Sequence, residues 1–225
     1  MNWQAFSLTL SLAGLVAVLL LIIGVPIAYW LAFSRWRWKF LIEAVVAMPL
    51  VLPPTVLGFY FLLFLGRSSW AGSWIAASLG TSLPFTFAGL AVASVLYSLP
   101  FAVQPFAAGF ASVDVKLMQA SALLGAGRAR TFFRVVLPLS RVSVLTGVVL
   151  SFAHTLGEFG VVLMVGGNIP GVTRTLSIAI YDNVQALDYQ AANQSAIVLL
   201  VLSFLMLSLV YGVNRYARAS WMGRS

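Results

Sequence analysis

Two ionisable side chains, His154 and Glu158, lie deep inside an apolar stretch of the sequence. A spacing of four residues puts them on one face of a helix, where an imidazole and a carboxylate could act in acid–base chemistry or bind a metal ion. Both activities need more partners than the chain offers, because His154 is the only histidine and cysteine is absent. No aspartate lies inside an apolar stretch to complete a serine–histidine–aspartate set. We therefore expect no catalytic residues, no metal site and no cofactor.

The same pair has two further interpretations. Ionisable groups inside a membrane are costly, and they usually face a bundle interior or a water-filled path. The pair can be a structural contact buried between helices, or it can line or gate a polar path. Glycines flank the carboxylate and permit close helix approach or local unwinding, which favours gating. The candidate gate on this segment consists of Gly157, Glu158, Phe159 and Gly160.

A proline-rich segment, 48–58, supplies a second candidate part of the gate. It reads MPLVLPPTVLG. Proline removes a backbone donor and clashes with the preceding turn, so a helix should be broken or kinked here. The break can be simple bending or a moving element that lines a pathway. The candidate residues are Pro53, Pro54, Thr55 and Gly58.

The elements that must position these residues are membrane helices. Of the 225 residues, 61% are hydrophobic and only 8% are charged, whereas soluble domains carry about 25% charge. Crossing the hydrocarbon takes roughly 20 apolar residues, and the backbone must be helical there. Five runs are long enough and do not alternate as barrel strands do. They predict a single all-α integral membrane domain over 1–225, with about five transmembrane helices at about 8–33, 44–65, 84–112, 142–166 and 195–214.

The basic residues fall on alternate sides of these runs. Two, Arg67 and Arg174, follow the second and fourth runs, and the other eleven follow the first, third and fifth. The positive-inside rule then places the N-terminus outside, and the C-terminus and the long basic loop in the cytoplasm. The net charge of +8 is thus explained by topology, and nucleic acid is not an expected partner, while membrane lipids are. The first run lacks a basic leader and is too long for a signal peptide, so we expect it to be retained.

The long basic loop, about 114–138, predicts a helical hairpin. Asp114 suits an N-cap for a helix over 115–124, and Gly125 can adopt positive φ and end it. Arg128, Arg130 and Arg134 follow on a second short helix, and Pro138 leads into the fourth run. The hairpin can lie on anionic lipid or dock into a protein groove. Its first helix presents a smooth surface of alanine, serine and glycine, which favours the groove.

This hairpin resembles the cytoplasmic coupling loop of ABC importer permeases. The family pattern is Glu-Ala-Ala, three residues, Gly, nine residues, Ile, one residue, Leu-Pro. The spacing is intact here, with Gln119-Ala120-Ser121, Gly125, Val135 and Leu137-Pro138, although glutamine replaces the usual glutamate. The resemblance implies a type I ABC importer permease fold and docking of the loop on a cytoplasmic ATP-binding subunit. The residues it implies for that contact are Gln119, Ala120, Ser121, Leu124, Gly125, Arg128 and Pro138.

Further segments resemble molybdate ABC transporter permeases, and sulfate permeases share part of them. These segments are 49–54, 113–117, 124–128, 156–160 and 168–175. The resemblance implies two permease copies, two ATPase subunits and a periplasmic oxyanion-binding protein in the bacterial inner membrane. It places docking of that binding protein at Asn168, Pro170, Gly171, Thr173 and Arg174. Alternatives are a sulfate, thiosulfate or tungstate ABC permease, and an ATP-independent channel or carrier.

Two absences complete the functional expectation. No GxxxxGK[ST] phosphate loop occurs, so ATP hydrolysis by that route must come from a partner. No lysine or arginine lies within an apolar run, so a divalent oxyanion would meet no deep cationic trap. We expect weak contacts with hydroxyls, glycine backbone and helix N-termini, with selectivity residing in the binding protein.

Overall fold

The computed structural model describes residues 2–222, which form helices joined by turns, with no strand among them. The all-α class predicted from the apolar runs is therefore confirmed. In chain order the elements are α1 (Trp3–Phe33), α2 (Lys39–Ala47), the 3-10 turn η1 (Met48–Leu50), α3 (Pro54–Leu65), α4 (Trp70–Leu79), α5 (Phe87–Ala111), α6 (Val115–Leu123), α7 (Arg128–Thr131), the π-helical η2 (Phe132–Val136), α8 (Leu137–Leu139), α9 (Arg141–Gly157), α10 (Gly160–Gly166), α11 (Leu176–Gln185) and α12 (Tyr189–Met222).

Three helices are long and apolar enough to cross a membrane alone: Trp3–Phe33, Phe87–Ala111 and Tyr189–Val213. If each of two bent helix pairs is counted as one span, the described residues contain up to five membrane spans. Lys39–Leu50 and Pro54–Leu65 meet at 110°, and Arg128–Leu139 and Arg141–Gly157 meet at 76°. Each apolar run of the sequence overlaps one of these helices or pairs.

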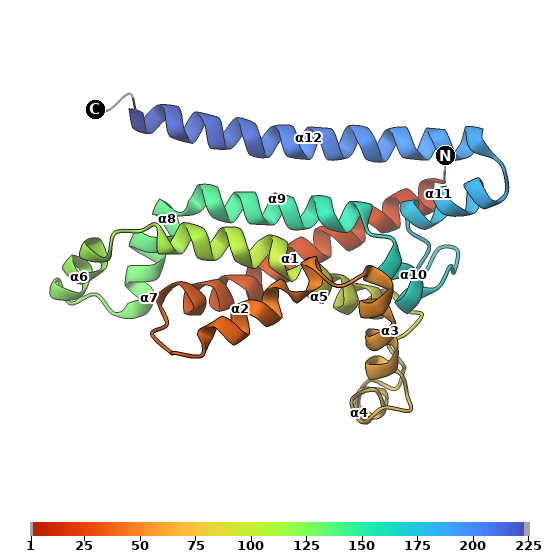
Figure 1. Ribbon diagram of the computed structural model, residues 1–225, viewed down its shortest axis with the longest axis horizontal. Helices are drawn as coiled ribbons and strands as arrows, with labels where there is room; N and C mark the ends of the chain where they lie inside the picture. Colours follow the sequence, from red (N-terminus) through yellow and green to blue (C-terminus); the bar gives the residue numbers. More distant parts are fainter. Residues whose placement is uncertain (1, 223–225) are drawn as a thin grey trace.

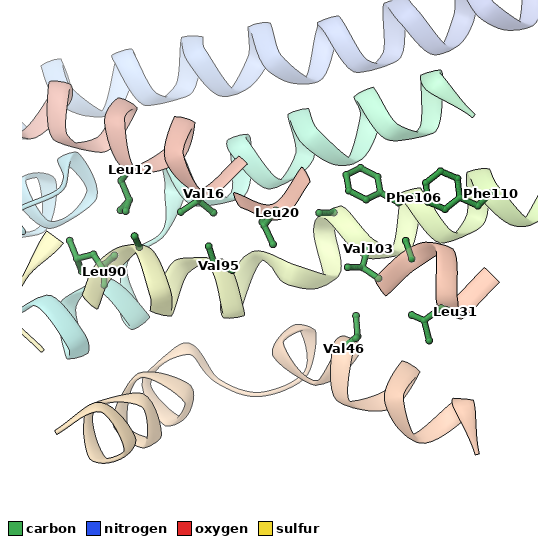
Figure 2. Close-up of a cluster of buried hydrophobic side chains, with 14 of the residues drawn as sticks. Leu12, Val16, Leu20, Leu31, Val46, Leu90, Val95, Val103, Phe106 and Phe110 are labelled. Atoms are coloured by element: carbon green, nitrogen blue, oxygen red, sulfur yellow. The ribbon is translucent and has the colours of Figure 1, made fainter. Parts of the chain in front are cut away.

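The largest core cluster lies mainly between α1 and α5, and Figure 2 shows it along the length of both helices. Phe106 and Phe110 of α5 are fully buried in it. Helix α9 joins this core through Gly147, where an added Cβ would stand 2.5 Å from the Phe106 ring. Small residues let two helices approach this closely. The hydrophobic effect does not hold helices together in lipid, so their attraction comes from close packing of atoms.

The basic loops gather at one end of the bundle. Figure 1 shows the α1–α2 turn and the α6–α8 hairpin at the same end, where the last turns of α12 also lie. The loop that carries Arg67, between α3 and α4, and the loop that carries Arg174, between α10 and α11, lie at the other end. This agrees with the alternation in the sequence. Arg224, one of the eleven basic residues, lies outside the described residues.

The third apolar run predicted a helix over about 84–112, and the helix starts later than that: α5 begins at Phe87 because Phe85 has a φ of +64° and cannot continue a helix. Thr86 caps the helix instead, its hydroxyl accepting a hydrogen bond of 3.1 Å from the Gly89 N–H. Past this point α5 runs unbroken to Ala111 through two internal prolines. Two short helices, α4 and α11, follow the loops that carry Arg67 and Arg174.

Candidate functional site

Two breaks in the membrane helices lie against each other. One precedes α3 at Pro54, and the other separates the end of α9 at Gly157 from the start of α10 at Gly160. Helix α10 packs on α3 so closely that a Cβ on Gly160 would stand 2.7 Å from Pro54 Cβ. A Cβ on Gly58 would likewise stand 2.6 Å from Met164 Cβ. Gly58 and Gly160, two of the three glycines predicted for the gate, are therefore contact points between two broken segments.

The remaining gate candidates occupy more open positions. Pro53 and Thr55 are exposed on the surface of the chain. A Cβ on Gly157 would meet no atom within 4 Å. Phe159 is half-buried, and its ring centroid lies 5.0 Å from that of Tyr181 in α11. Only part of the predicted set forms the contact between the two breaks.

Glu158 lies in the second break and is only 4% exposed. The prediction that it shares a helix face with His154 is wrong, because α9 ends at Gly157 and Glu158 is extended, with φ −65° and ψ 130°. The Ser94 hydroxyl of α5 lies near its carboxyl group. Even so, neither carboxylate oxygen nor Ser94 Oγ completes a hydrogen bond within the described chain. Unpaired polar atoms in such a dry position are destabilising.

His154 belongs to a different polar contact, between α9 and α5. Ser98 Oγ lies 2.9 Å from His154 Nδ1 and 3.0 Å from Thr155 Oγ1. The imidazole also stacks on Phe101, with 3.9 Å between ring centroids. Ser98 thus joins His154 and Thr155 of the neighbouring helix α9. The imidazole is held by its contacts with Ser98 and Phe101 of α5. This geometry is that of a packed polar contact between helices.

Sequence reasoning missed Ser94 and Ser98, which meet Glu158 and His154. The available signal was their spacing, since two serines four residues apart in an apolar run share one helix face. That signal is weak, because serine in a membrane helix commonly bonds to the backbone of its own preceding turn. Only the approach of α9 and α10 to α5 gives the two hydroxyls their facing groups.

The basic hairpin has the predicted local structure. Asp114 caps α6, its Oδ1 accepting a 2.8 Å hydrogen bond from the Lys116 N–H. Gly125 ends the helix with a φ of +77°, as predicted. The two residues just before the turn, Leu123 and Leu124, are 90% and 87% exposed. Adjacent leucines so fully exposed at the tip of a hairpin form an apolar contact surface for something outside the chain.

The two arms of the hairpin enclose a groove that is both apolar and basic. A hydrogen bond of 2.9 Å between Ser121 Oγ and Thr131 Oγ1 joins α6 to α7. The groove is lined by Leu117, Ala120, Ser121, Leu124, Ala126, Arg130, Arg134 and Val135. Among the other coupling candidates, Gln119, Gly125, Arg128 and Pro138 are exposed. The surface fits a partner that offers an apolar ridge and acidic groups.

The loop between α10 and α11 is held by its own side chains. Thr173 is fully buried, and its Oγ1 donates to Gly166 O at 2.7 Å and accepts from the Ile169 N–H at 3.1 Å. Arg174 Nε donates to Asn168 Oδ1 at 2.5 Å. Thr173 therefore shapes the loop from inside and presents no docking surface.

The outward part of that loop is anchored to α11. Asn168 Nδ2 donates to Asp182 Oδ2 at 2.6 Å, and Arg174 Nη2 lies 3.6 Å from the same oxygen. Pro170 and Gly171 are exposed at the tip. Sequence reasoning missed Asp182, because nothing in its local sequence indicates that α11 folds back beneath the loop. The result is an exposed tip whose base is held by hydrogen bonds and an ion pair.

Comparison with known proteins gives a consistent result. Residues 24–219 match a family model described as binding-protein-dependent transport system inner membrane component. The molybdenum transport system permease protein ModB of Azotobacter vinelandii is 52% identical over 213 residues, which cover 94% of each chain. The sulfate transport system permease protein CysT of Escherichia coli (strain K12) is 32% identical over 203 residues, covering 90% of this chain and 73% of that one. Among solved structures, the MetNI methionine ABC transporter in an inward-facing conformation aligns with a TM-score of 0.73 at 18% identity, over 97% of this chain and 95% of that chain.

Proposed function

The chain belongs to the family of binding-protein-dependent transport system inner membrane components, and on that basis we propose that it is the permease subunit of an ATP-driven molybdate importer. Family membership makes it a transport component of the inner membrane rather than an enzyme. The observation that carries the choice of substrate is the 52% identity to a molybdenum permease along nearly the whole chain, against 32% to a sulfate permease. Sulfate, thiosulfate and tungstate are the alternatives to be excluded.

In this proposal the α6–α8 hairpin docks on a cytoplasmic ATP-binding subunit. The exposed leucines at its tip and the Arg130 and Arg134 side chains in its groove support that contact. The hydrogen bond between Ser121 and Thr131 joins the two arms, and in this proposal it passes a push on α6 to α7 and, through η2 and α8, to α9. ATP binding then favours one state of the pathway and the loaded binding protein the other.

The contact between α3 and α10 is the gate of the pathway in this proposal. It lies toward the end of the bundle that carries α4 and α11, which the basic-residue alternation assigns to the outside. Helix α3 leaves Phe59, Tyr60 and Phe64 exposed on its other side. A second copy of the chain would cover that aromatic face and complete a pathway between the two subunits, and two ATPase subunits would serve the two hairpins.

A periplasmic binding protein docks on the tip of the α10–α11 loop in this proposal. Pro170 and Gly171 offer the contact, while Asn168 and Arg174 hold the tip in place through Asp182. A groove beside the tip is lined by Gly171 and Val172 together with the first turns of α1. A rigid tip next to a groove suits rigid-body docking with little rearrangement.

Uptake into vesicles tests the assigned substrate directly. The chain is reconstituted with the ATP-binding subunit and the periplasmic binding protein that the proposal assigns to it, and isotopic molybdate is supplied outside. Uptake should require both ATP and the binding protein, and excess sulfate should not compete. Competition by sulfate would move the assignment to the sulfate class, and uptake without ATP would move it to a channel or carrier.

Gly125→Val should uncouple the hairpin while leaving the chain inserted. The added Cβ would meet no atom within 4 Å, so the change acts only through the φ of +77°, where a β-branched residue is strained by about 1–2 kcal/mol. Gly127→Val is the matched control, since Gly127 has open space and an ordinary φ of −68°. Co-purification of the ATPase and molybdate uptake should fall in the first variant only. Equal behaviour of the two variants would separate Gly125 from coupling.

Single cysteines report which end of the bundle faces outward. The native chain has no cysteine, so background labelling is absent. Cysteines in place of Ser68 and Val172, both exposed, should react with an impermeant thiol reagent in intact cells. A cysteine in place of Ala129, exposed on the hairpin, should react only after the membrane is opened. The reverse pattern would invert the topology and put the hairpin out of reach of a cytoplasmic ATPase.

A further inference from the structure

A groove runs between the end of α1, α2 and α5, away from both the hairpin and the helix breaks. Its floor consists of small and aliphatic side chains, among them Leu31, Val46, Val103, Ala107, Ala108 and Ala111. Ala108 and Ala111 are exposed, so the floor is open to the surroundings of the bundle along α5. An apolar groove of this kind on a membrane helix bundle has the shape and chemistry to hold a hydrocarbon chain.

The polar side chains that line this groove are Lys39, Glu43 and Gln104. Lys39, the first residue of α2, lines it and sends its Nζ to Leu31 O at 3.4 Å, across to the last turns of α1. Glu43 lies one turn further along α2, with Oε1 3.8 Å from Lys39 Nζ. Gln104 lines the groove on α5 and is exposed there, although it lies within an apolar helix, about two turns before the helix ends. An exposed amide at this depth calls for a polar partner that hydrocarbon does not provide.

The turn between α1 and α2 directly precedes Lys39 in the chain and reads Arg35-Trp36-Arg37-Trp38. All four residues are exposed. Arg37 lies 5.4 Å from the centre of the Trp38 ring, and neither arginine forms an ion pair with any other residue of 2–222. Tryptophan prefers the level of the lipid headgroups, so this turn lies at a membrane surface. Its two arginines are uncompensated positive charges at headgroup depth.

We propose that this groove binds an anionic phospholipid of the adjacent leaflet. One acyl chain lies along the alanine-lined floor, the phosphate meets Arg35, Arg37 and Lys39, and the Gln104 amide donates to an ester carbonyl deeper in the groove. Three basic side chains against the single carboxylate of Glu43 favour an anionic over a zwitterionic headgroup. Basic pockets at helix junctions bind such headgroups, and each Lys or Arg near the surface attracts them by about 1 kcal/mol. The inference does not depend on which oxyanion is transported.

Native mass spectrometry of the intact assembly tests the proposal. The protein is purified in mild detergent and titrated with phosphatidylglycerol and with phosphatidylcholine of the same acyl chains. Phosphatidylglycerol should be retained preferentially. The double variant R35Q/R37Q should weaken its retention roughly 30-fold, the equivalent of two charges at about 1 kcal/mol each. The control R67Q removes an exposed charge at the opposite end of the bundle and should change nothing.

A second variant tests the groove itself rather than the charges. A108F fills the floor from an exposed position and should displace the lipid, whereas A77F on the exposed face of α4 should not. Equal retention of both lipids, or unchanged retention in R35Q/R37Q, would overturn the proposal. A disulfide formed between two copies that each carry A108C would also overturn it, because protein would then occupy the groove.

Discussion

Replacing Gly160 by valine is expected to hold the two helix breaks apart and to let molybdate leak across the membrane without ATP. A Cβ at this position would stand 2.7 Å from Pro54 Cβ, and the proline ring cannot rotate away. Helices α3 and α10 must then separate. Overpacking of this kind typically costs about 1–3 kcal/mol, which shifts a two-state gate toward its open form roughly 5- to 150-fold.

The measurement is the efflux of isotopic molybdate from preloaded vesicles that contain no ATP. Gly157→Val is the matched control, because it adds the same side chain three residues earlier, where a Cβ would meet nothing within 4 Å. Efflux should rise in Gly160→Val and stay at the wild-type level in Gly157→Val. Tight vesicles with Gly160→Val would show that the contact between the breaks does not close the pathway.

The parts of the structure that follow from local sequence were predictable. The first arm of the hairpin is specified within a dozen residues. Asp114 caps α6 at its start, and Gly125 adopts the positive φ that ends it. The break before Pro54 follows from proline chemistry alone. The apolar runs predicted the helices, because a backbone in lipid must form a helix or a closed barrel and these runs do not alternate as barrel strands do. None of these inferences needed knowledge of distant residues.

What depends on distant residues was not predictable. The burial of Thr173 arises because the loop turns back so that its hydroxyl meets the Gly166 carbonyl. The separation of His154 from Glu158 arises because α9 stops at Gly157, although a helical spacing alone puts them together. Glycines on both sides of Glu158 allowed either a close helix contact or an unwound turn, and the sequence offered no means to choose between them.

Glu158→Leu should have the opposite effect to Gly160→Val and lock the gate shut. Both Glu158 oxygens already lack partners within the described chain, so leucine removes an unsatisfied buried group of similar size. Removing that penalty stabilises the closed form of the gate by about 1–3 kcal/mol.

The expected result for Glu158→Leu is normal assembly with molybdate uptake reduced at least tenfold, while Glu158→Gln, which keeps the shape and polarity, retains most of the uptake. Reconstituted vesicles with the ATPase and binding protein measure uptake and hydrolysis together. The double variant Glu158→Leu/Gly160→Ala provides the sharpest test, because a closing and an opening change at one contact should offset each other and restore part of the uptake. Normal uptake in Glu158→Leu would make the carboxylate a bystander. Loss of uptake without recovery in the double variant would place its role outside the contact between α3 and α10.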